Sequence, residues 1–331
     1  MPNSTALLAV TLILVLGAEF VNGWTDAPNA IATVVTTRVL TPLQAVLMAA
    51  VLNIVGALTT GTAVASTIGS GIVKTGSISL EVVAAAMITI LLWSGVTWYF
   101  AIPTSKSHEL IAGLTGAGFA AAGKNALLWS GWEKVLIGLG FSTIVGFLFG
   151  IIIMSTLFWM LQGFKLGNIR KVFSRLQILS SAFMAYSHGS NDGQKFMGVF
   201  ALALVLGGKL AKFSVPWYVM IACGTVMGLG TIIGGWRIIH TLGHKLTKLE
   251  PINGFAAETS ASAAILIASR FGVPLSTTHC VTTSIMGVGA SRRFSAVRWG
   301  VARNIVLTWL VTFPVCAVMG YIFSLILTRV F

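Results

Sequence analysis

Apolar runs divide the chain, and each is long enough to cross a lipid bilayer. About 20 apolar residues suffice to span roughly 30 Å of hydrocarbon. Runs of about that length recur along the sequence: residues 5–21, 45–65, 82–102, 135–161, 217–235 and 305–327. Only 9% of the residues are charged, whereas a soluble protein has about 25%. A polar surface around a soluble core is therefore excluded, and the sequence predicts an all-α polytopic membrane protein.

The formal net charge of +13 does not indicate a nucleic-acid partner. Lys and Arg form short clusters between apolar runs, as at 165–175 and 292–303, which is the distribution expected of cytoplasmic loops. We assign alternate loops to the two sides of the membrane and count Lys106 in a loop. With both termini outside, the larger share of the Lys and Arg residues then lies inside. We therefore predict a multi-pass protein of the cell (plasma) membrane with both termini outside.

Two motifs each occur twice, in the same order. Residues 20–32, FVNGWTDAPNAIA, align with residues 186–198, YSHGSNDGQKFMG, which sets Asp26 against Asp192. Residues 101–118, AIPTSKSHELIAGLTGAG, align with residues 272–289, GVPLSTTHCVTTSIMGVG. Two matches in one order indicate an internal duplication. We predict two transmembrane repeats, residues 1–168 and 169–331.

We expect about ten membrane segments, or twelve, with an odd number in each half. An odd number inverts the second half relative to the first, as in many secondary transporters. The expected segments are 5–36, 43–65, 80–102, 104–122 and 134–161, then 177–206, 216–236, 253–270, 275–290 and 300–328. Glycines and Pro28 predict that the first segment of each half is broken. The segments 104–122 and 275–290 are expected to be short, re-entrant-like helices.

Asp26 and Asp192 are the strongest candidates for a functional site. A charge at bilayer depth costs several kcal/mol, so it marks a site with a partner. Inverted repeats would bring the two carboxylates to equivalent places near the midplane. With the carbonyls of broken helices they would form an oxygen cage for a metal ion such as Na⁺. The expected coupling-cation ligands are Asn22, Thr25, Asp26, Asn29, Ser190, Asn191 and Asp192. The alternative is that both aspartates cap helix breaks.

The second motif, Pro-x-Ser-x-Ser/Thr-His, is typical of a helix start. Two helix N-termini pointing inward from opposite sides would suit an anion, because each carries partial positive charge and free N–H donors. The hydroxyl groups expected to help are those of Ser105, Ser107, Ser276, Thr277 and Thr278. Ordinary capping at a membrane surface is the alternative.

Four further residues have two interpretations each. His108 could donate a hydrogen bond to the anion, or it could pack between helices. Lys195 could bind the anion, or it could pair with Asp192. Glu109 and Glu258 could bind coupling cations, or they could pair with buried basic groups.

The segments SHGSNDGQKFMG and DAPNAIATVVTTRVLTP, together with both Pro-Ser-His motifs, resemble the inorganic phosphate transporter family over essentially the whole chain. The resemblance implies symport of inorganic phosphate with Na⁺ or H⁺ by a protein that is not an enzyme and is often a homodimer. It carries the family signature onto Asp26, Asn29, Asn191, Asp192, Gln194 and Lys195, and we expect the last two to bind phosphate. Thr25 stands where the family has Asn, so the first cation site is expected to be altered or weaker.

Three other functions compete with phosphate symport by alternating access. A sulfate permease of the same fold would bind another tetrahedral oxyanion, but phosphate keeps a proton that a carboxylate can accept. An anion channel would not need carboxylates beside its ion. An intramembrane aspartyl protease could use two aspartates, although it would not need them in a repeated motif. The sequence HEL at 108–110 lacks the second zinc ligand of HExxH, because residue 112 is Ala.

Overall fold

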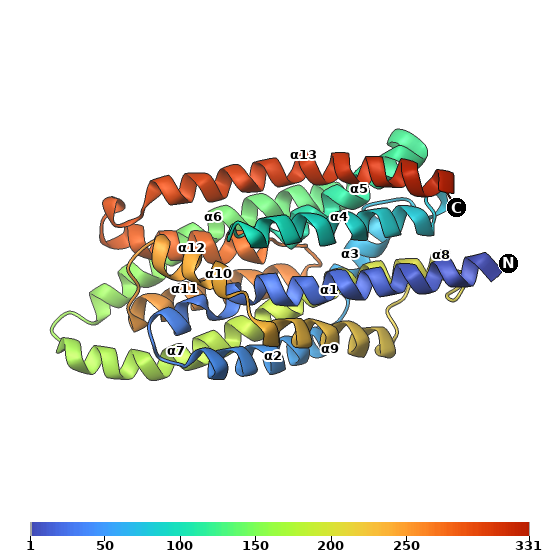
Figure 1. Cartoon of the computed structure of the whole chain (residues 1–331). Coiled ribbons are helices and arrows are strands. Elements are labelled where there is room, and N and C mark those ends of the chain that lie inside the picture. Colours follow the sequence, from blue (N-terminus) through green and yellow to red (C-terminus); the bar gives the residue numbers. More distant parts are fainter. Residues whose placement is uncertain (1, 331) are drawn as a thin grey trace.

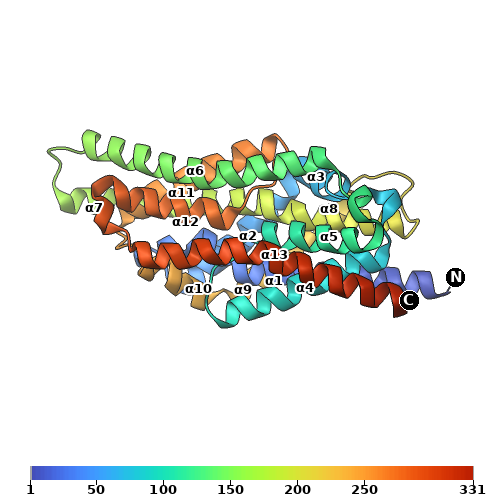
Figure 2. The same ribbon diagram turned by 90° about the horizontal axis from the view of Figure 1, so that it is seen from above.

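The chain folds into an elongated bundle of helices whose long axes follow one common direction (Figures 1 and 2). The structure is a computed structural model that describes residues 2–330, and side chains there other than those of residues 2–4, 27 and 244. The helices of the first half are α1 (Pro2–Thr36), α2 (Pro42–Thr59), α3 (Ala63–Gly71), α4 (Leu80–Tyr99), α5 (Lys106–Ala122) and α6 (Trp129–Met160). Those of the second half are α7 (Leu166–His188), α8 (Gln194–Leu206), α9 (Trp217–Ile233), α10 (Trp236–His240), α11 (Pro251–Arg270), α12 (Thr277–Arg292) and α13 (Trp299–Val330). Two π-helical segments, Gly189–Gly193 and Thr241–Lys245, follow α7 and α10.

Capping residues fix where the key helices begin. The Ser105 hydroxyl accepts a hydrogen bond from the His108 amide nitrogen at 3.3 Å, and the Ser276 hydroxyl accepts one from the His279 amide at 3.1 Å. Each serine thereby satisfies one of the free N–H groups of a first helical turn. The helix starts predicted from the Pro-x-Ser motif are confirmed by α5 and α12.

The prediction that the first segment of each half is broken is wrong. Helix α1 continues from Pro2 to Thr36 with Pro28 inside it, and the second copy is interrupted only by a π-helical segment, which keeps the chain helical. The motif glycines allow helix packing instead: a Cβ atom at Gly23 would collide with the Met227 carbonyl of α9, and one at Gly189 with the backbone of Asn53 in α2. Small residues permit such close backbone approach in membrane bundles.

Two other predicted boundaries are also wrong. The segment 43–65 is two helices, because α2 ends at Thr59 and α3 begins at Ala63 after Gly61 at φ 81°, a conformation that glycine adopts readily. The segment predicted to start at residue 177 starts at Leu166, so most of the stretch expected to separate the halves is helical.

Five helices of the described chain are long and apolar enough to cross a membrane: Thr5–Thr36, Pro42–Thr59, Leu80–Tyr99, Trp129–Met160 and Trp299–Val330. A sixth span results if the bent pair α9–α10 is one span. Large apolar side chains such as Ile13, Ile144 and Leu310 are exposed on the outer faces of these helices, as expected where lipid replaces water. The polytopic membrane class is therefore confirmed, and the count of ten segments stays a prediction.

A polar layer separates two apolar cores. One core contains Val15 and Ala18 of α1 and the residues of α8 from Phe196 onward. The other core contains the residues of α1 from Ala30 onward and those of α7 up to Ala185. Buried polar side chains lie between them, and most of those near Asp26 and Asp192 come from four places: 19–29, 186–195, 104–109 and 276–279. All the repeated motifs therefore meet in one layer inside the bundle.

The two halves of the chain interleave instead of forming separate lobes. Helix α1 packs against α9 and α2 against α7, while α5 packs against α13 and α6 against α12. Helices α6 and α13 run in opposite directions, and both termini lie at one end of the bundle (Figure 1). The expectation that Lys106 lies in a loop is wrong: it is the first residue of α5 and only 2% exposed.

Candidate functional site

Helix α1 presents a buried polar stripe to the polar layer. Glu19, Asn22, Asp26 and Asn29 follow one another at spacings of three and four residues, so their side chains lie on one face of the helix. All four are at most 3% exposed. Asp26 is therefore held inside the protein and does not face lipid.

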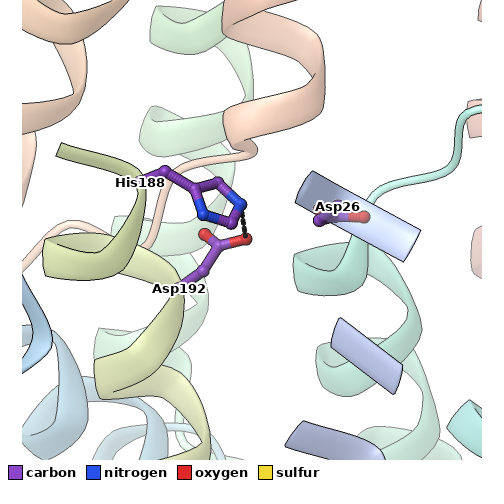
Figure 3. Close-up of side chains that lie close together, drawn as sticks. All are labelled: Asp26, His188 and Asp192. Carbon is purple, nitrogen blue, oxygen red and sulfur yellow. Dashed lines mark ion pairs between the residues drawn. The ribbon is translucent and has the colours of Figure 1, made fainter. Parts of the chain in front are cut away.

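The π-helical segment after α7 presents the facing acidic group. Asp192 and His188 point toward Asp26 from the opposite side (Figure 3). One ligand atom from each of the three residues lies within 4.8 Å of the other two, and all three side chains are buried. The His188 Nε2 atom is 3.4 Å from the Asp192 Oδ2 atom and has no hydrogen-bond partner. Two carboxylates and an imidazole nitrogen at this spacing can hold a cation or a proton.

Asp192 has a positive partner within the protein. The Lys195 ammonium forms an ion pair with its Oδ1 atom and donates a second hydrogen bond to the Leu275 carbonyl at 2.7 Å. The Thr277 hydroxyl donates to the Asp192 Oδ2 atom at 3.0 Å. The interpretation that Lys195 pairs with Asp192 therefore describes this conformation.

Asp26 has a different environment. Its Oδ2 atom accepts a hydrogen bond from the Thr278 hydroxyl at 3.2 Å, and the Asn29 amide donates to the same hydroxyl oxygen at 3.1 Å. None of the ion pairs between described residues includes Asp26. Asp26 is thus a buried carboxyl with one hydroxyl donor and no ammonium partner, which leaves it capacity for a cation.

The starts of α5 and α12 meet beside these carboxylates and exchange hydrogen bonds. The Ser107 hydroxyl donates to the Leu275 carbonyl at 2.6 Å, and the Thr278 hydroxyl donates to the Thr104 carbonyl at 3.0 Å. The two contacts correspond in the aligned motifs. Both N-termini, with their partial positive charge, therefore lie in the polar layer next to Asp26 and Asp192.

A buried ion pair lies at the start of α5, so pairing with a buried basic group, one of the two interpretations of Glu109, describes this conformation, although its partner Lys106 had been assigned to a loop. The Lys106 ammonium lies 2.8 Å from the Glu109 Oε1 atom, which also accepts from the Thr104 hydroxyl at 2.7 Å, and the Ser94 hydroxyl donates to Oε2. Thr277 and Cys280 occupy the aligned positions in the second copy. The charged pair, at a spacing of three residues on a helix, was the available signal.

Four predicted ligands have partners outside the acidic centre. Gln194 accepts from the Val64 amide at 2.9 Å and so caps α3. Thr25 and Ser190 donate to carbonyls of their own helical segments, and Asn191 donates to the Ser269 hydroxyl at 2.8 Å. Phosphate or cation binding by these groups stays a prediction. The Thr25 and Ser190 oxygens can still accept while their hydroxyls donate, and the buried Asn191 Oδ1 atom has no hydrogen-bond partner.

His108 and Glu258 lie in clusters of their own. The His108 ring contacts the His279 ring edge to face at 4.6 Å and also packs on Phe313. Glu258 of α11 accepts hydrogen bonds from the Thr33 and Ser180 hydroxyls. Thr33 lies one helical turn beyond Asn29 on α1.

Asn53 completes the acidic centre and was not singled out in the sequence. Its Oδ1 atom lies 3.1 Å from the His188 Nδ1 atom, and its amide donates to the Thr231 hydroxyl at 3.1 Å. This contact orients the imidazole so that Nε2 faces Asp192. An isolated amide inside the apolar run 45–65 was the only signal.

A membrane-spanning bundle that buries unpaired carboxyl groups beside two helix N-termini has the features of a membrane transporter. Comparison with known proteins specifies the family. A model of the "Phosphate transporter family" matches residues 22–320. The chain therefore belongs to the phosphate transporter family, and it is a multi-pass membrane transporter. The family consists of transporters and not of enzymes, so the protease alternative is set aside.

Relatives and a solved structure agree with this assignment. A "Probable low-affinity inorganic phosphate transporter" of Rhizobium meliloti (strain 1021) is 42% identical over 320 residues, covering 96% of this chain and 95% of the relative. A protein of the same description from Bacillus subtilis (strain 168) is 41% identical over 334 residues, covering 98% and 99%. The structure described as "The sodium-dependent phosphate transporter" matches with a TM-score of 0.88 at 24% identity, over 98% of this chain and 100% of that one, which shows a common fold.

Proposed function

We propose that this chain imports inorganic phosphate together with Na⁺ or H⁺ as a secondary active transporter. The observation that carries the proposal is the pairing of Asp26 and Asp192 in one buried site, beside the facing starts of α5 and α12. The carboxylates bind the cation and the helix starts bind the anion. Cation and anion then neutralise each other in a layer that lacks bulk water.

Phosphate is favoured over sulfate by the unpaired carboxyl of Asp26. Near neutral pH phosphate retains a proton and can donate it to a carboxylate, whereas sulfate carries no such proton. Ser107, Thr277 and Thr278 donate to protein acceptors in this conformation, and the incoming oxyanion would take over these hydrogen bonds. The names of the relatives from Rhizobium meliloti and Bacillus subtilis support phosphate as well.

The transport cycle is proposed to follow from an inverted duplication of residues 1–168 and 169–331. The reciprocal contacts Ser107 to Leu275 and Thr278 to Thr104, and the opposite directions of α6 and α13, support a two-fold relation between the halves. Alternating access then corresponds to the two halves exchanging conformations around a central site.

A surface pocket of about 320 Å³ supports a gate at the turn between α11 and α12. Its lining includes Ser66 and Ser70 of α3, Lys134 near the start of α6, and Gly272 in that turn. Leu275, three residues beyond Gly272, accepts hydrogen bonds from Lys195 and Ser107 in the polar layer. Opening of residues 271–275 would join this pocket to the site.

The proposed setting is the cell membrane, with both termini outside. Basic clusters at 165–175, 237–248 and 292–303 lie at the end of the bundle opposite the termini (Figure 1). The buried Lys106 is no longer counted among the basic residues of that end. The remaining excess of Lys and Arg still favours a cytoplasmic location for the end opposite the termini. A homodimer stays a prediction from the family resemblance.

The test is uptake of labelled phosphate into proteoliposomes, with Na⁺ and pH gradients imposed separately. We expect accumulation driven by at least one gradient, competition by unlabelled phosphate, and none by equimolar sulfate. Asp26→Asn and Asp192→Asn should abolish accumulation, and Glu133→Gln, on the exposed start of α6, should not. Uptake that runs only down the phosphate gradient in every condition would refute coupled transport.

A further inference from the structure

A groove of about 330 Å³ lies on the outer face of the bundle between α4 and α13. The residues that line this α4–α13 groove are Trp93, Val96, Thr97, Phe100, Ile102, Leu307, Thr308 and Val311. The hydroxyls of Thr97 and Thr308 donate to carbonyls of their own helices. Phe100 is 65% exposed and Leu307 is 45% exposed. In a membrane-spanning chain such a surface faces lipid, and the groove offers it an apolar recess.

Two indole hydrogen bonds fix how the helices run along the groove. The Trp93 N–H donates to the Thr312 hydroxyl at 3.1 Å, and the Trp309 N–H donates to the Pro103 carbonyl at 3.2 Å. Later residues of the first segment therefore pair with earlier residues of α13, so the two strands of chain are antiparallel. The end of α4 lies beside the early turns of α13.

An arginine stands at the mouth of the groove that faces the start of α13. Arg303 lies one helical turn before Leu307 on the same face of that helix, and it is exposed. It takes part in none of the ion pairs between described residues. Trp299, one turn further back, is a residue type that gathers at the level of lipid headgroups. The groove thus leads from an uncompensated positive charge into the apolar layer.

A second arginine adds positive charge near the same mouth. The exposed Arg237 of α10 donates to the Tyr99 carbonyl at 2.9 Å, and its guanidinium lies 5.0 Å from the centre of the Trp98 ring. The Tyr99 ring in turn contacts the ring of Phe100, with 5.2 Å between their centres. None of the eight acidic residues of the chain belongs to α10, α13 or the second half of α4.

We propose that the α4–α13 groove is a binding site for an anionic phospholipid, with an acyl chain in the groove and the headgroup phosphate at Arg303. The groove supplies apolar contact, and basic groups at headgroup level attract anionic lipids. A zwitterionic lipid would gain the first contribution without the second. A second copy of the chain is the other possible occupant, but a two-fold contact sets the same patch against itself and would bring like charges together. The inference concerns the outer face of the bundle and does not depend on the transported ions.

The occupant of the groove lies behind the turn that precedes α5. Thr97, in the groove lining, has its hydroxyl 3.2 Å from the Thr104 hydroxyl, which donates to Glu109 at 2.7 Å. The hydrogen bond from Trp309 to Pro103 joins the same turn to α13. An acyl chain packed here restricts the motion of residues 100–105 and so steadies the start of α5.

Native mass spectrometry of the purified chain measures the affinity for the first bound lipid, with phosphatidylglycerol and with phosphatidylcholine of the same acyl chains. We expect phosphatidylglycerol to bind at least tenfold more tightly. Arg303→Gln should reduce this preference about fivefold, the share expected of one arginine near an anionic headgroup. Arg329→Gln, at the exposed far end of the same helix, is the matched control and should keep the preference. Equal affinities in the wild type, or a preference that Arg303→Gln does not change, would overturn the proposal.

A second pair of variants tests the groove itself. Leu307→Trp fills it and should weaken the binding of both lipids, whereas Val318→Trp, at another exposed position of α13, should not. Conversion of a dimer into a monomer by Leu307→Trp, with lipid binding unchanged, would assign the groove to a second copy and overturn the lipid site. Where Leu307→Trp does not fold, the result for Arg303→Gln decides alone.

Hydrogen exchange in lipid nanodiscs tests the effect on the turn. The amides of residues 100–106 should exchange more slowly in phosphatidylglycerol than in phosphatidylcholine, and Arg303→Gln should diminish the difference. The aligned turn at residues 271–277 is an internal control and should exchange equally in both lipids. Equal slowing of both turns, or no slowing at residues 100–106, would show that the bound lipid does not steady the start of α5.

Discussion

The Thr278 hydroxyl connects the cation side of the site to the anion side, and removing it is the sharpest single perturbation available. Its one proton is shared between the Asp26 Oδ2 atom at 3.2 Å and the Thr104 carbonyl at 3.0 Å. Its oxygen accepts from the Asn29 amide at 3.1 Å. Thr278→Val keeps the shape of the side chain and removes all of these contacts.

The expected size of the effect follows from two hydrogen bonds: the one that the Thr278 hydroxyl donates and the one that its oxygen accepts from Asn29. A neutral hydrogen bond contributes about 1 kcal/mol and one to a charged group about 1.5–3 kcal/mol. Their sum is roughly 2–4 kcal/mol, or about 30- to 1,000-fold in an equilibrium constant. These contacts hold Asp26 at a fixed position relative to the start of α5. Their loss should therefore lower the transport efficiency for phosphate.

The assay compares Vmax/KM for gradient-driven phosphate uptake between Thr278→Val and Thr282→Val. Thr282 is a matched control: it lies on α12, is 0% exposed, and its hydroxyl has no hydrogen-bond partner. Thr282→Val should be within about twofold of the wild type, since no hydrogen bond is lost. Equal efficiencies in the two variants would refute the role given to Thr278.

The remaining predictions concern charge pairs and a helix cap. Lys106→Met should destabilise the protein by about 3–5 kcal/mol, because it leaves Glu109 buried without a partner. The double variant Lys106→Thr with Glu109→Cys, which introduces the residue types found at these positions in the second copy, should recover most of that loss. Thermal unfolding in detergent measures both variants. Equal melting temperatures for the single and double variants would contradict the reasoning. Gln194→Ala should cost about 1–2 kcal/mol through loss of the α3 cap while uptake per folded molecule persists; abolished uptake would instead favour the predicted phosphate contact. Asp192→Met should make Lys195→Met less destabilising than it is alone, because both buried charges are then absent; additive losses of thermal stability in detergent would argue against pairing.

The class of fold and the centre of the site could be predicted because they depend on local composition and on repetition. Apolar runs report membrane segments directly, and the alignment of Asp26 with Asp192 indicated which residues face each other across the bundle. The Pro-x-Ser starts of α5 and α12 were predictable because capping is a local interaction.

The sequence did not reveal contacts that depend on how helices pack. Gly23 and Gly189 were interpreted as helix breakers, yet they allow close approach of α9 and α2, because a missing Cβ atom serves either purpose. Lys106 was assigned to a loop because a charged residue next to a turn motif has the same local pattern whether it is exposed or buried. Asn53, alone in an apolar run, gains its role only through contact with His188.

Equilibrium binding of phosphate to the purified protein tests most directly the claim that cation and anion share one buried site. Phosphate affinity should be measured by calorimetry at several Na⁺ concentrations and pH values, for the wild type and for Asp26→Asn. We predict that a coupling cation raises phosphate affinity at least tenfold and that phosphate raises cation affinity by the same factor, since such linkage is reciprocal. Asp26→Asn should lose this linkage. Phosphate affinity that does not change with either cation in the wild type would contradict the account.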